Sequence, residues 1–180
     1  ITAYNDRGSA KRLTGDINGA VSDYKKAIQL SKKALYHNNL GSALRLQGKL
    51  KEAVQSYTKA IQLDKNSYLA YNNRGRVRFE LKLYKEAIDD FNKAIQLNKE
   101  YAYAYNNRGN AYYKLKEYKK AITDYDKAIN LNKNYGVAYL NRGISKEMAR
   151  DPKGACNDWK KAESFGLKSA SSYLSQSCNH

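Results

Sequence analysis

A chain of 180 residues is long enough for one compact domain or a short solenoid, and its hydrophobic content of 42% is enough for a core but too low for a membrane protein. No apolar run reaches the roughly 18 residues of a membrane-spanning helix, and a single proline excludes collagen-like and proline-rich chains. Its 33 lysines and arginines against 17 acidic residues give a net charge of +16, so acidic partners are expected.

Five copies of one sequence pattern follow one another along the chain, which predicts a repeat architecture. Each copy has glycine at position 8, alanine at position 20, an aromatic ring at position 24 and alanine at position 27, as in Gly109, Ala121, Tyr125 and Ala128 of the fourth copy. The predicted repeats are residues 1–33, 34–67, 68–101, 102–135 and 136–169, followed by a tail at residues 170–180.

Each repeat is predicted to form two helices. The first half has small or ring-bearing residues at positions 4, 8 and 11, and the second half, such as Tyr118–Leu131, has the apolar spacing of an amphipathic helix. The last second helix is predicted to begin at Asp151 and Pro152, a capping residue followed by a first-turn proline. Tyr173 falls at position 4, so the tail is predicted to form a capping helix, and a chain with both ends covered is expected to be a monomer.

The pattern of small, small, ring and small residues resembles the tetratricopeptide repeat family over nearly the whole chain. The resemblance implies an all-α fold, a right-handed α-solenoid of helix-turn-helix units that forms a single domain over residues 1–180. It also implies a concave groove, lined by the first helices, in which family members hold extended peptides. The chain departs from the family by having lysine or Leu167 where a proline usually ends the second helix, and its first repeat is one residue short.

Asparagine recurs at positions 5 and 6 of the first helices, although it costs about 0.5 kcal/mol relative to alanine in a helix. A ladder of amides, which donate and accept, can hold a peptide by its backbone; the alternative is that these asparagines bond to neighbouring helices and stiffen the superhelix. Specificity is assigned to variable residues of the groove. The predicted peptide-binding residues are Asn38, Asn39, Asn72, Asn73, Asn106, Asn107, Asn141, Arg45, Arg76, Phe79, Tyr103, Asn110 and Tyr113.

Some family members clamp the carboxylate of a chaperone tail, but this chain has only Asn110 and Asn141 of that clamp in the right order. Capture of chaperone tails is therefore not expected, whereas Arg45 and Arg76 can attract an acidic peptide. His37 replaces the tyrosine of position 4 and is predicted to pack rather than react. With no phosphate-binding loop, metal-spaced cysteines or catalytic triad in view, the sequence predicts a non-catalytic scaffold without cofactor or metal.

An alternative function involves the lysines, which gather at positions 18 and 26 and in the loops, on the side away from the groove. They either keep the chain soluble or dock it, as a basic module, on nucleic acid or another anionic surface through the convex face. Most of the 17 tyrosines fall at packing positions and are not free to stack on bases, so binding to nucleic acid is not favoured.

Positions 7 and 23 vary together among the repeats. Arginine at position 7 accompanies aspartate at position 23 in four repeats, and the repeat with Leu40 has Ser56 instead. This predicts an ion pair between the two helices of each of the four repeats, so these arginines are expected to be structural. The predicted pairs are Arg7–Asp23, Arg74–Asp90, Arg108–Asp124 and Arg142–Asp158.

Cys156 and Cys178 each lie 11 residues from Leu167, where the last helix of the repeats turns into the tail. Two antiparallel helices folded about that point would bring the sulfur atoms to the same level. A disulfide and a pair of buried thiols both remain open at this stage. A disulfide would indicate an oxidising compartment such as a periplasm or the exterior, and free thiols a reducing cytosol; the sequence assigns neither the compartment nor the partner.

Overall fold

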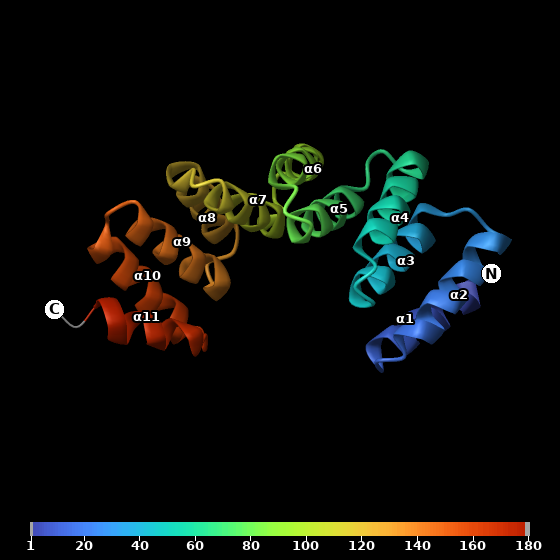
Figure 1. Cartoon of the computed structure of the whole chain (residues 1–180), viewed down its shortest axis with the longest axis horizontal. Helices are drawn as coiled ribbons and strands as arrows, with labels where there is room; N and C mark the ends of the chain where they lie inside the picture. The colour runs from blue at the N-terminus through green and yellow to red at the C-terminus, as the bar shows by residue number, and fades with distance from the viewer. Residues whose placement is uncertain (1, 179–180) are drawn as a thin grey trace. The chain divides into compact units, whose positions relative to one another are not determined.

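The computed structural model describes residues 2–178, and over these residues it contains eleven α-helices and no strand (Figure 1). The all-helical fold predicted from the sequence is confirmed, and the number of helices agrees with five repeats and a capping helix. The helices are α1 (Thr2–Leu13), α2 (Ile17–Leu30), α3 (Ala34–Leu46), α4 (Leu50–Leu63), α5 (Tyr68–Glu80), α6 (Tyr84–Leu97), α7 (Ala102–Lys114), α8 (Tyr118–Leu131), α9 (Gly136–Met148), α10 (Pro152–Ser164) and α11 (Ser169–Ser177).

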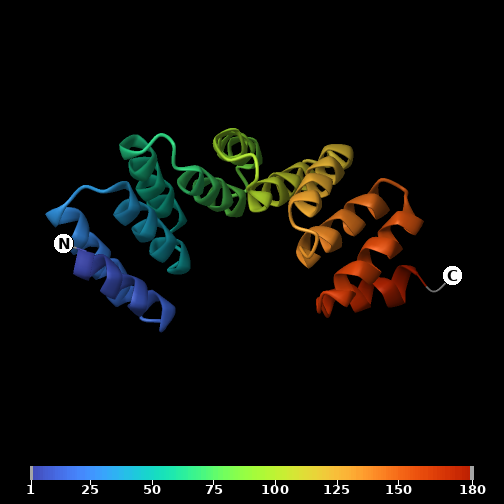
Figure 2. The same cartoon turned by 180° about the vertical axis from the view of Figure 1, so that it is seen from behind.

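The helices pack in pairs, each pair formed by the two helices of one sequence repeat. α1 packs against α2, α3 against α4, α5 against α6, α7 against α8 and α9 against α10, while α11 packs against α10. The front and back views both show α10 and α11 side by side (Figure 1, Figure 2). Within each half, successive repeats are joined through the second helix of one and the first helix of the next, as in α2 with α3 and α8 with α9.

The chain separates into two compact parts. The N-terminal half (Ile1–Leu97) holds α1 to α6, and the C-terminal half (Asn98–His180) holds α7 to α11. Each half has a core of its own: in the N-terminal half it includes Tyr24, Leu44 and Tyr57. The description of residues 1–180 as a single domain stays a prediction.

The two helices of a repeat approach closely because the residues at their contact are small. Ala121 and Ala128 of α8 are fully buried, and Gly109 of α7 faces the ring of Tyr125. A Cβ atom on Gly109 would lie 2.7 Å from Cε1 of that ring, closer than packed atoms approach. The glycine at position 8 is therefore required by the ring at position 24.

The turn between the two helices of each repeat places one residue at position 15 in the left-handed backbone region. Gly15 and Gly48 have φ of 88° and 75°, and the third to fifth repeats have a lysine or an arginine there instead: Lys82, Lys116 and Arg150, with φ of 62° to 65°. Glycine adopts this conformation without steric cost. The three basic residues thus accept a backbone conformation that their side chains disfavour.

The predicted ion pairs between positions 7 and 23 are confirmed in all four repeats. In the second repeat Ser56 donates instead to the carbonyl oxygen of Glu52, at 3.0 Å, and Leu40 is buried. The paired atoms and distances are Arg7 Nε–Asp23 Oδ2 2.8 Å, Arg74 Nη2–Asp90 Oδ1 2.7 Å, Arg108 Nε–Asp124 Oδ2 2.8 Å and Arg142 Nε–Asp158 Oδ2 2.8 Å. These arginines hold the two helices of a repeat together.

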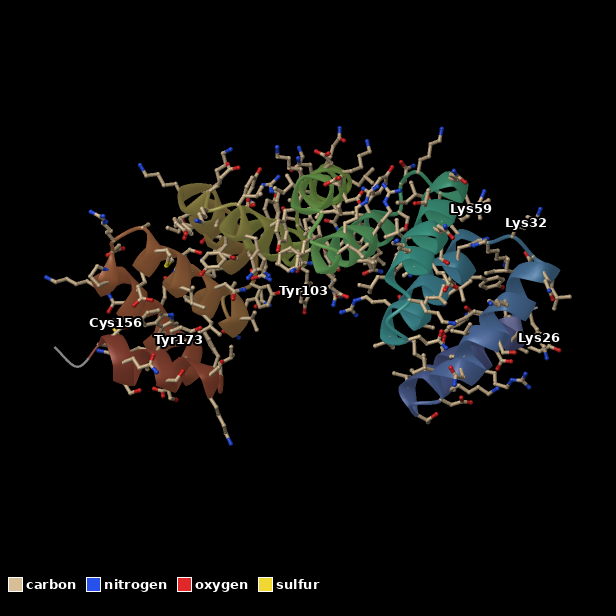
Figure 3. The ribbon with its side chains drawn as sticks, viewed as in Figure 1. Lys26, Lys32, Lys59, Tyr103, Cys156 and Tyr173 are labelled. Carbon is tan, nitrogen blue, oxygen red and sulfur yellow. A yellow bond between two sulfur atoms is a disulfide. The ribbon has the colours of Figure 1, made fainter. Side chains whose placement is uncertain are left out.

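The contacts between the capping helix α11 and α10 include stacked aromatic rings, a hydrogen bond from Ser171 to Glu163 and a covalent bond. The rings of Trp159 and Tyr173 stack with centroids 5.0 Å apart. A disulfide joins Cys156 of α10 to Cys178, the residue that follows α11. Figure 3 shows Cys156 and Tyr173 on these neighbouring segments of the C-terminal half.

We expect that reducing this disulfide, or replacing Cys178 by serine, lowers the free energy of unfolding by about 3 kcal/mol, since a bond 22 residues apart restricts the unfolded chain. Urea unfolding followed by circular dichroism, with and without dithiothreitol, measures the change. The Cys156→Ser/Cys178→Ser variant is the control and should not respond to dithiothreitol. Two free thiols in the denatured, unreduced protein would contradict the bond.

Candidate peptide-binding site

The asparagines at positions 5 and 6 of the first helices differ in depth in the third and fourth repeats. At position 5, Asn72 and Asn106 are only 2% and 3% exposed, whereas Asn38 of the second repeat is half-buried. At position 6, Asn39, Asn73, Asn107 and Asn141 are half-buried. A peptide lying on the third or fourth repeat would therefore meet position 6 first.

Within each half, the amide at position 6 donates a hydrogen bond to the amide at position 5 of the preceding repeat. In the N-terminal half, Asn73 Nδ2 donates to Asn38 Oδ1 at 3.1 Å, and the same bond from Asn39 to Asn5 measures 2.8 Å. These bonds join first helices of successive repeats, as the stiffening alternative requires. They also fix the orientation of each amide at position 6.

The C-terminal half repeats this arrangement with one addition. Asn141 Nδ2 donates to Asn106 Oδ1 at 3.1 Å and to Asn110 Oδ1 at 3.0 Å. Asn110 also accepts a bond from the hydroxyl of Tyr125, at 2.8 Å. Asn110 thus belongs to the network between the helices, in addition to its predicted place in the groove.

The predicted aromatic residues of the groove are partly held by neighbouring rings. Phe79 packs on Tyr84 with ring centroids 5.4 Å apart, and Tyr113 packs on Tyr118 at 5.6 Å. Tyr103 is different, because it is 54% exposed although its ring contacts Tyr101 and Tyr135. Figure 3 shows Tyr103 projecting from α7, which makes it the predicted ring most accessible to a ligand.

A polar cavity of about 150 Å³ lies on the first helices of the N-terminal half. It brings together three of the predicted residues, Arg45, Asn73 and Arg76. Arg12 is not among the predicted residues, although it occupies position 12 of its repeat as Arg45 does; this shared position is the signal that could have identified it. The residues that line the cavity are Arg12, Ser42, Arg45, Leu46, Tyr57, Asn73 and Arg76.

The arginines at position 7 are engaged with their aspartates, and the surroundings of each aspartate decide its pKa. The hydrogen bond from Arg7 lowers the pKa of Asp23 well below its usual range, and Lys11 acts in the same direction. Burial raises the pKa of Asp124, because loss of hydration opposes its charged form more than the bond from Arg108 favours it. These charged pairs hold the two helices of a repeat together.

His37 is the one histidine among residues 2–178. Burial lowers the pKa of His37, as does the charge of Lys59, which agrees with a packing role for this imidazole. Among residues 2–178 no group of three or more histidine, cysteine or acidic side chains is placed to hold a metal ion. None of the helices described there combines the length and the apolar composition needed to cross a membrane.

The lysines of the second helices and loops lie mostly at the surface. Figure 3 shows Lys26, Lys32 and Lys59 at the edge of the N-terminal half, with their side chains pointing away from the ribbon. Lys93 is half-buried, and the other lysines at positions 18 and 26 are exposed: Lys26, Lys51, Lys59, Lys85, Lys119, Lys127, Lys153 and Lys161.

Sequence models of the family match most of the chain. The tetratricopeptide repeat models match residues 1–33 and 102–135, and a TPR repeat model matches residues 41–82 and 75–116. A comparison with curated proteins finds no match.

Three solved structures illustrate the similarity. The crystal structure of MamA is 32% identical over 91% of this chain and 96% of that one, with a TM-score of 0.80. The first TPR domain of Spaghetti (RPAP3), bound to the HSP90 peptide SRMEEVD, is 32% identical over 67% of this chain and 95% of that one, with a TM-score of 0.65. Pseudomonas aeruginosa PilF, at 24% identity, shares the fold with a TM-score of 0.88 over 96% of this chain and 79% of that one. On the repeated pattern, the paired helices and these matches, the chain belongs to the tetratricopeptide repeat family.

Proposed function

We propose that the chain is a non-catalytic scaffold that binds an extended segment of another protein along its first helices. The observation that carries the proposal is the orientation of the amides at position 6. The Nδ2 group donates a hydrogen bond to the Oδ1 atom of an asparagine in the preceding repeat in Asn39, Asn73 and Asn141. The Oδ1 atom of each of these side chains is then available to accept a bond from a backbone N–H of a peptide.

Fixed acceptors favour binding because little side-chain freedom is lost when the ligand arrives. An extended backbone presents N–H groups at regular intervals, and in the N-terminal half the acceptors of Asn39 and Asn73 lie in successive repeats. This kind of contact involves the peptide backbone and does not depend on the peptide sequence. Selectivity for the peptide sequence would come from side chains of the chain such as Tyr103 and Arg76. The similarity to the RPAP3 domain, which binds a short acidic peptide, supports the same class of ligand.

Peptide binding and stiffening, the two roles considered for the asparagine ladder, predict different results for two substitutions. Both substitutions remove the hydrogen bond between Asn73 and Asn38. Asn73→Ala removes the donor together with the Oδ1 atom proposed to face the peptide, whereas Asn38→Ala removes the Oδ1 atom that accepts from Asn73. We expect Asn73→Ala to weaken binding of a peptide selected from a random display library by about 1–3 kcal/mol, the cost of unmet hydrogen bonds. Asn38→Ala should weaken it much less, as measured by isothermal titration calorimetry.

Melting temperatures of both variants provide the control, because the two lose the same bond between helices. If both bind equally well and both melt several degrees lower, the asparagines serve only to stiffen the stack.

Salt dependence separates the proposal from the alternative of a basic module that docks through its lysines. Binding through many lysines would weaken steeply between 50 and 200 mM salt, whereas binding through amides with a single charged contact should weaken far less.

A further inference from the structure

Three arginines from three successive first helices meet in the polar cavity of the N-terminal half. Arg12 comes from α1, Arg45 from α3 and Arg76 from α5. The cavity of about 150 Å³ exceeds the roughly 15 Å³ that a single water needs, so it has room for a small charged group. Burial raises the pKa of Tyr57, which also lines the cavity, while the charges of Arg45 and Arg76 act in the opposite direction, as expected for guanidinium groups near its hydroxyl.

Arg76 reaches the cavity because its repeat lacks a contact that the preceding repeats have. In the second repeat, Ser42 at position 9 lies 3.0 Å from the hydroxyl of Tyr57 at position 24, and the first repeat has the same contact. The third repeat has Phe91 at position 24, a ring without a hydroxyl, and Arg76 at position 9. Arg76 therefore has no ring hydroxyl to bind, and its side chain is exposed.

One carboxylate already lies at the edge of this cluster. Arg45 Nε is 2.6 Å from Glu80 Oε1, with both side chains about one third exposed. A guanidinium group has five N–H donors in a planar fork, so this pair leaves donors of Arg45 for a second acceptor. Neither Arg12 nor Arg76 has a carboxylate partner among the described residues, which leaves the cavity with an excess of positive charge.

We propose that this cavity is a subsite for one aspartate or glutamate side chain within the bound segment, and that Glu80 competes with that side chain for Arg45. The proposal rests on the proposed function, because Asn73 lines the same cavity and would bind the backbone beside it. Asn39 of α3 and Asn73 of α5 continue the ladder past the cavity, so the backbone passes it and the carboxylate comes from a side chain.

The test is a selection of random nine-residue peptides, displayed with both ends blocked, on the full chain. We expect the selected peptides to share an acidic residue at one position. Changing that residue to its amide should lower affinity about tenfold or more for the wild-type chain, since a hydrogen bond to a charged group is lost, and by less than about twofold for Arg76→Gln or Arg12→Gln. Glu80→Gln should raise affinity by about two- to fivefold, because an exposed ion pair is weak.

Arg150→Gln is the matched control, because it removes one exposed positive charge outside the cavity and should leave affinity unchanged. Circular dichroism and thermal melting check that each variant folds. Selected peptides without an acidic preference, or full affinity of both arginine variants for them, would overturn the subsite while the proposed function stands. The selection is repeated with a library whose C-terminus is free; binders from that library alone would overturn the side-chain source. No selected peptide from either library would overturn both proposals.

Discussion

Replacing Trp159 by alanine is expected to lower the free energy of unfolding by about 3–5 kcal/mol, the usual cost of removing a buried aromatic side chain. Trp159 is 0% exposed and belongs to the core of the last repeat. It also stacks on Tyr173 of α11 and lies against Gly143 of α9, so its removal leaves a cavity between three helices. Urea unfolding followed by circular dichroism measures the loss.

Trp159→Phe is the matched control. Its ring keeps much of the contact with Tyr173 and gives up the indole N–H, which has no hydrogen-bond partner among the described residues. The loss should therefore be clearly smaller than for alanine. Trp159 is the only tryptophan, so its fluorescence in the wild-type chain also reports the unfolding of this repeat. A loss below about 1 kcal/mol for Trp159→Ala would show that α9, α10 and α11 are held together by other contacts.

Replacing Asp124 by serine is expected to cost about 3–5 kcal/mol, because it leaves the guanidinium group of Arg108 beside the core without its carboxylate. Asp124 is only 4% exposed, and burial raises its pKa. Both observations indicate that loss of hydration offsets much of the attraction within the pair. The pair as a whole should then stabilise the repeat far less than the loss of one partner destabilises it.

The second repeat provides the control for this prediction, since it has Leu40 and Ser56 at the same two positions. Transplanting these residues as Arg108→Leu/Asp124→Ser should recover most of the stability that Asp124→Ser alone loses. Urea unfolding of the wild type, both single variants and the double variant forms a double-mutant cycle. Additive effects of the two substitutions would contradict an energetic coupling between positions 7 and 23.

The sequence was sufficient wherever a physical requirement recurs in every repeat. The glycine at position 8 and the ring at position 24 must fit together each time, so their spacing predicted the helix pairs that the structure contains. Aspartate at position 23 requires arginine at position 7, because a buried carboxylate without a partner is costly. The second repeat, which has Leu40 with Ser56, revealed this dependence in the sequence. The four resulting contacts were predicted residue by residue.

Only the tertiary structure decided how residues of different repeats divide their roles. Asn72 and Asn73 are residues of the same type, but helix geometry buries the first side chain and leaves part of the second at the surface. The cavity collects Arg12, Arg45 and Arg76 from three helices of three repeats; the first two share position 12, whereas Arg76 comes from position 9. A pattern that recurs in every repeat indicates the packing and charge pairing required for folding, because all copies fold in the same way. A binding site forms where copies differ, and which differences lie side by side depends on how the helices stack.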